Sequence, residues 1–248
     1  MVAKLVFPGD AISDLNLPVS KGLHPAFGLH RDSSSSPIIA TFAGALHQNP
    51  KKKAAYITAP NARYIPRVGD LVIAQVQRSS MDFFHLSIYP HTPQAILPQL
   101  AFEGASKKTR PQLKPNDLVY ARVLSANKNM EVELSCVNPS TGKSEPEGLG
   151  PINGGMVFEI STGLAARLLN SQSVVVLEEL GEKLAGGFEI AVGKNGKVWV
   201  DCPESGVKGI CAVGKCLQET DYGNLLENEQ QDLVKRVIKG LGRAASPS

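Results

Sequence analysis

The chain has 248 residues, of which 42% are hydrophobic and 20% charged, and this balance excludes an intrinsically disordered chain. The length is enough for two or three small domains that each bury a core. The formal net charge is only +3, so composition alone does not indicate a nucleic-acid-binding protein, and a surface for polyanions has to be local.

The four cysteines contain no C-x-x-C pair, and no histidine lies at a zinc-finger spacing, a pattern typical of reduced thiols in an intracellular protein. The first ten residues, MVAKLVFPGD, lack the apolar segment of a signal peptide. No apolar run approaches the roughly 20 residues that span a bilayer. We therefore expect a soluble intracellular protein with no membrane partner.

Residues 1–60 predict a small β-rich domain with loops between its strands. Short apolar stretches at 2–7, 37–42 and 54–58 are the expected strands. The serine run at 33–36 predicts a mobile loop, and the three lysines at 51–53 predict the solvated tip of a hairpin.

Residues 61–148 predict a five-stranded barrel of the OB type. Evenly spaced strands are expected at 70–77, 82–89, 92–97, 117–125 and 131–137, with turn signals between them. In the second strand, Phe84 and Leu86 alternate with Phe83 and His85, so the two pairs lie on opposite faces. OB folds stack bases on such a face, and Phe83 and His85 are candidate RNA-stacking residues unless a neighbouring domain covers them.

Residues 149–248 predict a KH domain. After a Gly/Pro-rich linker at 138–155, we expect a strand at 156–160, a helix capped by Thr162, a second helix, two strands around Asn195-Gly196, and a longer amphipathic helix at the end. The order β-α-α-β-β-α is that of an RNA-binding KH domain.

The sequence Gly193-Lys194-Asn195-Gly196 resembles the G-x-x-G loop with which KH domains clamp RNA, but it lies between two strands instead of two helices. The expected helix–helix connection at 170–173 contains no glycine. Asn-Gly is the strongest signal for a two-residue type I′ hairpin turn. We therefore interpret the loop as a structural turn, in which Val192 lies opposite Trp199.

Basic residues are concentrated at 104–128, where six lysines and arginines accompany a single aspartate. Lys107, Lys108 and Arg110 lie in an expected loop between barrel strands, where their side chains could contact RNA phosphates. A solvated loop, or a loop that contacts another protein, remains an alternative interpretation.

Nothing in the sequence predicts catalysis. The five histidines are dispersed, and none pairs with a carboxylate at a metal-ligand spacing. Residues 209–216 have P-loop spacing, but Cys216 replaces the hydroxyl residue that would hold Mg²⁺. We expect this segment to be a loop that leads into the terminal helix, and we expect no enzyme activity, no cofactor and no metal.

Several stretches together resemble the non-catalytic cap subunits of the eukaryotic RNA exosome. They are "GGMVFEISTGLAARLL", "FEIAVGKNGKVWV", "AFEGASKKTRPQLKPNDLVYARV", "NKNMEVELSCV" and the early "VFPGD". The resemblance covers most of the chain and is weakest at 11–55. It implies an N-terminal β domain, an S1-type OB domain and a KH domain.

The resemblance also implies partners. They are the RNase-PH-like subunits of a six-membered ring, other cap subunits, and single-stranded RNA guided into the central channel for 3′-to-5′ processing and degradation, with no DNA expected. It implies a location in nucleus, nucleolus and cytoplasm. Two alternatives stay open from the residues: a free-standing OB/KH RNA-binding adaptor, and an unrecognised hydrolase for which no residue can be nominated.

Overall fold

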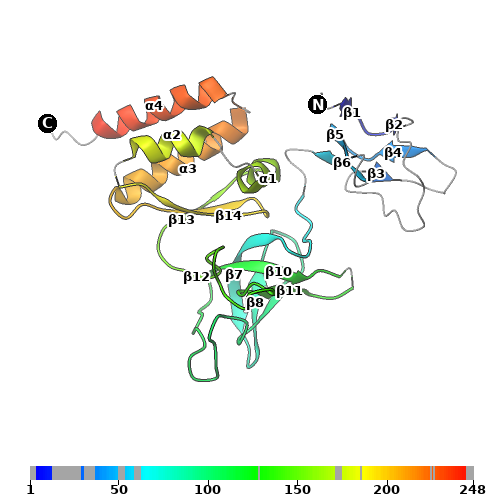
Figure 1. The fold of residues 1–248 in the computed structure, drawn as a ribbon, viewed down its shortest axis with the longest axis vertical. Coiled ribbons are helices and arrows are strands. Elements are labelled where there is room, and N and C mark those ends of the chain that lie inside the picture. Colours follow the sequence, from blue (N-terminus) through cyan, green and yellow to red (C-terminus); the bar gives the residue numbers. More distant parts are fainter. Residues whose placement is uncertain are drawn as a thin grey trace. The chain divides into compact units, whose positions relative to one another are not determined.

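The computed structural model describes residues 4–12, 29–30, 37–49, 54–58, 63–127, 129–170, 175–184, 186–223, 225 and 227–243. The chain divides into two units, Met1–Ala62 and Arg63–Ser248 (Figure 1). The first unit has one hydrophobic core cluster and the second has two. The predicted serine loop at 33–36, the lysine tip at 51–53 and most of the glycine-free connection at 170–173 lie outside the described residues.

The first unit contains two small antiparallel sheets. One has the order β1 (Lys4–Val6), β5 (Gly44–Asn49), β6 (Ala54–Thr58), and the other the order β2 (Ala11–Ile12), β4 (Ile38–Ala40), β3 (Leu29–His30). Alternate apolar residues such as Val6, Leu46 and Ile57 form the core. The central strand β5, with the sequence GALHQN, was not predicted, because few of its residues favour strands. Its pairing with β1 on one side and β6 on the other stabilises it as a strand.

The second unit begins with a closed five-stranded barrel. Its strands are β7 (Leu71–Ser79), β8 (Phe83–Ser87), β9 (Ala95–Pro98), β10 (Leu118–Ser125) and β11 (Val132–Ser135). They follow the order β7-β8-β9-β11-β10, and pairing of β10 with β7 closes the barrel. Only the β9–β11 pair is parallel. This is the predicted OB arrangement, and all five expected strands are present.

A short strand, β12 (Gly150–Ile152), pairs with the first half of β10, whose second half pairs with β11. The remaining elements are β13 (Met156–Glu159), α1 (Thr162–Asn170), α2 (Val175–Lys183), β14 (Glu189–Gly193), β15 (Lys197–Asp201), α3 (Gly206–Gly223) and α4 (Glu227–Arg243). Strands β13-β15-β14 form an antiparallel sheet with the helices on one face and the barrel on the other (Figure 1). The order is that of a KH domain with one additional helix.

Helix α1 is capped by Ser161 and not by the predicted Thr162. The Ser161 hydroxyl oxygen accepts a hydrogen bond from Leu164 N at 3.0 Å. The Asp221 carboxylate, from the end of α3, accepts from both the amide and the hydroxyl of Ser161, at 2.6 and 2.5 Å. The cap therefore also ties α1 to α3.

The segment at 209–216 is helical, so the prediction of a loop there was wrong. It forms the middle of α3, and its glycines are sites of close packing. A Cβ atom on Gly214 would lie 2.2 Å from the Phe158 ring of β13. The glycine thus lets α3 approach the sheet closely, a role that a sequence pattern cannot separate from a turn signal.

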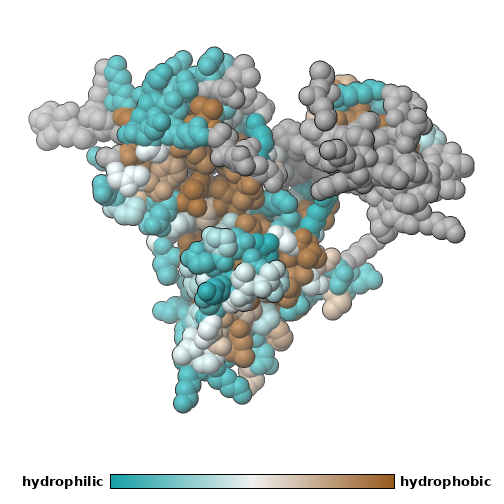
Figure 2. Space-filling view, in the orientation of Figure 1, coloured by the Kyte–Doolittle hydropathy of each residue, from teal (hydrophilic) through white to brown (hydrophobic). Residues whose placement is uncertain are grey.

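Helix α4 carries charged residues on its exposed side, and Figure 2 shows hydrophilic residues along the top of the helical part with a hydrophobic area below them. Among the described helices, none is long and apolar enough to cross a membrane.

Candidate nucleic-acid interface

The Gly193–Gly196 turn has three residues between its strands, because Gly193 pairs with Lys197. Gly196 N donates to Gly193 O at 3.0 Å, and Gly196 takes φ +78°. Asn195 does not have a positive φ, so the predicted two-residue type I′ turn was wrong. The turn is a four-residue reverse turn closed by a glycine in the left-handed region.

The longer loop shifts the predicted register by one residue and therefore reverses the faces of β15. Val192 lies opposite Val198, and Trp199 lies opposite Ala191. Val198 and Val200 point into the helical core, whereas Trp199 points into the core of the barrel.

Asn195 joins the KH sheet to the barrel. Its side chain is only 1% exposed, and its Nδ2 donates to Ile73 O at 2.9 Å and to Ile88 O at 2.7 Å. Its Oδ1 accepts from Ile73 N at 3.3 Å. Strand β8 pairs with β7 only from Gln75 onward, so this side chain satisfies the part of the β7 edge that β8 leaves open.

The neighbouring residues of the turn complete this joint. Lys194 N donates to Leu71 O at 2.8 Å, and Lys194 Nζ forms an ion pair with the buried Asp70 at 2.6 Å. Gly193 is required for close approach, since a Cβ there would lie 2.8 Å from Ile73 N. The turn therefore faces the barrel, with the backbone amides of Lys194 and Gly196 already hydrogen-bonded.

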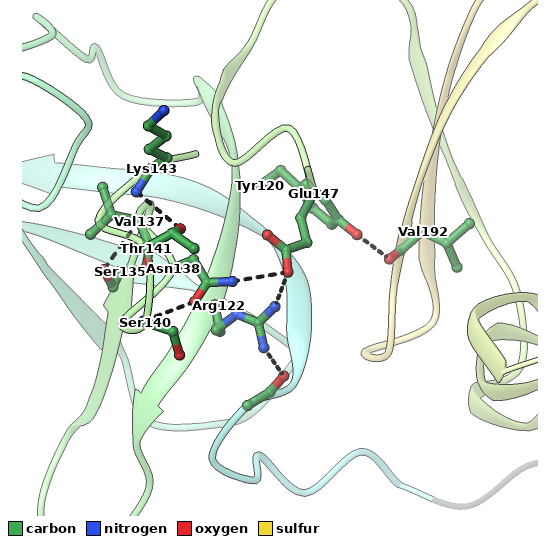
Figure 3. Close-up of polar contacts among 11 residues, drawn as sticks. Tyr120, Arg122, Ser135, Val137, Asn138, Ser140, Thr141, Lys143, Glu147 and Val192 are labelled. Atoms are coloured by element: carbon green, nitrogen blue, oxygen red, sulfur yellow. Dashed lines mark hydrogen bonds and ion pairs between the residues drawn. The ribbon is translucent and has the colours of Figure 1, made fainter. Parts of the chain in front are cut away.

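Two buried aromatic side chains link the same surfaces. Trp199 Nε1 donates to Gly154 O at 2.8 Å. The Tyr120 hydroxyl donates to Val192 O at 3.0 Å (Figure 3). Burial raises the pKa of Tyr120 to about 12. These contacts make the barrel and the KH domain a single packed body.

The segment between β11 and β12 is fastened to the barrel and is not a free linker (Figure 3). Arg122 donates to Glu147 at 2.6 Å and to Gly69 O at 3.2 Å, and Asn138 Nδ2 donates to the same Glu147 oxygen at 3.4 Å. Nearby, Ser144 donates two hydrogen bonds to Glu103, which hold the pKa of this carboxyl below its usual range. Arg122 contributes to the basic stretch in sequence, but its charge is neutralised in the structure.

The outer surface of β8 carries the predicted stacking residues. Phe83 is 39% exposed and His85 is half-buried, while Phe84 and Leu86 point into the barrel. His85 Nε2 lies 3.3 Å from the Ser80 hydroxyl, and its Nδ1 has no hydrogen-bond partner among the described residues.

Arg110 reaches back to the start of β8 from the loop between β9 and β10. Its guanidinium donates to the side-chain oxygen of Gln99 and, at 3.4 Å, to Met81 O. Gln99 is buried and donates to Ser80 O at 2.6 Å. Since Gln99 directly follows Pro98, the register partner of Phe83, Arg110 lies at the same end of the barrel as Phe83.

Lys107 and Lys108 occupy the exposed middle of a tight turn in this loop. Ser106 and Thr109 close the turn with a hydroxyl–hydroxyl contact of 2.8 Å, and Arg110 N donates to Ser106 O at 3.0 Å. The loop is thus internally bonded, and both ammonium groups lie at its surface.

One cation that the sequence reasoning missed is Arg78. It is exposed, follows a bulge in β7 and pairs in register with His85, so both side chains project from the same face. The bulge changes the alternation of the strand, and this explains why a simple period of two did not single out Arg78. The name barrel face is used hereafter for the set of Arg78, Phe83, His85, Lys107, Lys108 and Arg110.

Comparison with known proteins identifies both domains of the second unit. Residues 64–150 match the family model for the S1 domain of exosome complex component RRP40, and residues 155–206 match a KH domain model. A crystal structure of an exosome complex RNA-binding protein superposes with a TM-score of 0.57, at 23% identity over 75% of this chain and 100% of its own, which supports the fold alone.

Relatives that are themselves named exosome complex component RRP40 align with most of the chain. The exosome complex component RRP40 of Saccharomyces cerevisiae is 33% identical over 96% of this chain and 97% of its own length. That of Drosophila melanogaster is 39% identical over 79% of this chain and 81% of its own. The chain therefore belongs to the RRP40 family of exosome complex components.

Proposed function

We propose that this exosome subunit is a non-catalytic cap subunit that stabilises the ring of RNase-PH-like subunits and guides single-stranded RNA into the central channel. One observation carries the RNA part of the proposal. The turn that resembles a G-x-x-G clamp is closed in the joint with the barrel, with Asn195 only 1% exposed. The cations and aromatic rings of the barrel face are left to contact RNA.

The barrel face combines the two kinds of group that bind single strands without strong sequence preference. Lys107, Lys108 and Arg110 supply charge for phosphates, and Phe83 and His85 supply flat rings on which bases can stack. These few contacts should bind RNA weakly in the isolated subunit. RNA binding becomes strong in the assembled ring, where several RNA-binding surfaces surround one channel. An RNA strand held at one surface then binds the next surface intramolecularly, at a high effective concentration.

The assembly role can be tested by gentle affinity purification of the tagged protein from its own cells, with sizing and mass spectrometry. We expect one large particle with ring subunits and other cap subunits at equal stoichiometry, recovered from nuclear, nucleolar and cytoplasmic fractions. Elution as a small species that carries only RNA would overturn the cap role and indicate a free-standing adaptor.

The RNA role can be tested in the reconstituted exosome with Lys107→Glu and Lys108→Glu combined. We expect the affinity for single-stranded RNA to fall about ten-fold and the salt dependence to weaken by about two phosphate contacts, because each cation releases counterions on binding. The matched control is Lys235→Glu with Lys239→Glu, the same charge change on exposed lysines of α4. An unchanged RNA affinity in the Lys107/Lys108 variant would contradict the assignment of this loop.

A further inference from the structure

A groove of about 520 Å³ runs between α3 and α4, on the helical side of the KH domain. Its floor is apolar and is formed by Cys211, Ala212, Leu233 and Val237. It is separate from the barrel face, because the barrel packs on the opposite side of the β13-β15-β14 sheet.

The groove has the dimensions of a helix-binding site. On α3 it is lined at positions 207, 211, 215 and 219, a spacing of four that marks one stripe along a helix. Twelve residues of helix extend about 18 Å, which matches about three turns of a docked helix. At Gly240 of α4 the wall is open, since a Cβ there would meet no atom within 4 Å.

The rim of the groove is predominantly cationic. Lys208, Lys215 and Arg236 line it together with a single carboxylate, Glu219. Lys215 lies 3.6 Å from Glu219 in an exposed pair, which contributes little energy. Lys208 and Arg236 are exposed and form no ion pair with the described residues. Two positive charges at the rim are thus left for a ligand.

We propose that this groove docks an acidic amphipathic helix of a partner protein. Apolar side chains at i, i+3 and i+7 of that helix fill the floor, and flanking carboxylates pair with Lys208 and Arg236. Single-stranded RNA fits less well, because the lining contains no aromatic ring on which a base could stack. The proposal is independent of the RNA role of the barrel face.

Cys211 provides a reporter inside the groove. It is exposed, whereas the other three cysteines are buried and burial raises the pKa of their thiols. A thiol reagent therefore modifies Cys211 first in the folded chain. A ligand bound in the groove should therefore slow the modification of Cys211.

The test uses the full chain and a fluorescein-labelled helical peptide of about 14 residues, with leucines on one face and glutamates beside them. Fluorescence anisotropy measures its affinity, and the rate of Cys211 modification locates the binding site. We expect a Kd of about 10–100 µM and slowed modification at saturation. Arg236→Glu should weaken binding about ten-fold, because it replaces attraction by repulsion.

Gly240→Leu should abolish binding while the fold is retained, since it fills the open wall and replaces a helical glycine by a better helix former. Lys239→Glu, on the same helix but outside the lining, is the matched control and should leave the affinity unchanged. Three results would overturn the proposal. They are no binding of the peptide at about 1 mM, equal binding of a peptide in which lysines replace the glutamates, or protection of Cys211 by oligouridine that Arg236→Glu abolishes.

Discussion

At the scale of single residues, Asn195 connects two domains through three hydrogen bonds to backbone groups of the barrel. Asn195→Ala leaves the amide and carbonyl of Ile73 and the carbonyl of Ile88 without these partners in a buried site. We expect the free energy of unfolding to fall by about 3 kcal/mol, since each unpaired buried group costs about 1–3 kcal/mol. Urea denaturation measures the change.

Asn127→Ala is the control for this variant, because Asn127 is exposed and its side-chain amide donates, among the described residues, only to the Ser125 hydroxyl, at 3.3 Å. It should change the free energy of unfolding by less than about 0.5 kcal/mol. If both alanine variants were equally stable, the joint would not depend on Asn195.

Gly196 illustrates a different requirement, that of the backbone. Its φ is +78°, and an added Cβ would lie 2.5 Å from Ile160 O. Gly196→Val should therefore destabilise the chain by about 2–4 kcal/mol through strain and collision. Thermal unfolding checks this expectation. Intact thermal stability together with lost RNA binding would instead mean that the turn is an RNA clamp.

The sequence indicates the turn residues, but it cannot reveal what they bind. Asn195 and Gly196 carry a local turn signal, and their placement between two apolar strands follows from hydrophobic pattern alone. The partners Ile73 and Ile88 are 122 and 107 residues away in the chain. Such contacts depend on how two finished domains pack, and no local pattern encodes them.

At the scale of elements, the strands of the barrel were predictable because each is a short apolar or alternating stretch between clear turn signals. The two faces of β15 were not predictable, because one additional residue in the loop turns every side chain of the strand to the opposite face of the sheet. Helix α3 was missed for a related reason: Gly209 and Gly214 indicate a loop in sequence, although Gly214 serves to accommodate the Phe158 ring. A glycine in a sequence can therefore mark close packing instead of a turn.

Strand β10 gives the joint a dependence on pH through Tyr120. Burial raises the pKa of Tyr120 to about 12, above the value of about 10 expected in an unfolded chain. The folded state therefore holds this proton more tightly. The contribution of this proton to the free energy of unfolding is fully present below about pH 10 and is lost as the pH rises toward 12.

Tyr120→Phe should lower the free energy of unfolding by about 1 kcal/mol at neutral pH, because the hydrogen bond to Val192 O is removed. The difference from the native chain should shrink above about pH 10, where ionisation of Tyr120 weakens the native joint. Urea denaturation over a pH series measures both effects. Tyr222→Phe, at a side chain that is 93% exposed, is the control and should follow the native curve throughout.

At the scale of the whole molecule, residues 63–248 form one unit in which two domains share a core. Trp199 belongs to the KH sheet by sequence and to the barrel by packing. A fixed angle between the domains would give an exosome subunit a rigid shape, so that contacts made to ring subunits by one domain also orient the barrel face of the other. The proposed guidance of RNA depends on this rigidity.

This coupling predicts a single cooperative unfolding transition for residues 63–248. Fluorescence of Trp199, the only tryptophan of the chain, reports the joint, and far-ultraviolet circular dichroism reports helices α1 to α4 of the KH domain. In the native chain the two signals should change at the same urea concentration.

Asn195→Asp should separate the two signals, with fluorescence changing first. The new carboxylate would face the carbonyls of Ile73 and Ile88 and open the joint before the helices unfold. Asn127→Asp, an exposed change of the same kind, should leave the signals together. Separate transitions in the native chain would show that the domains are not coupled. Coincident transitions in Asn195→Asp would assign the coupling to Trp199 and Tyr120 instead of the turn.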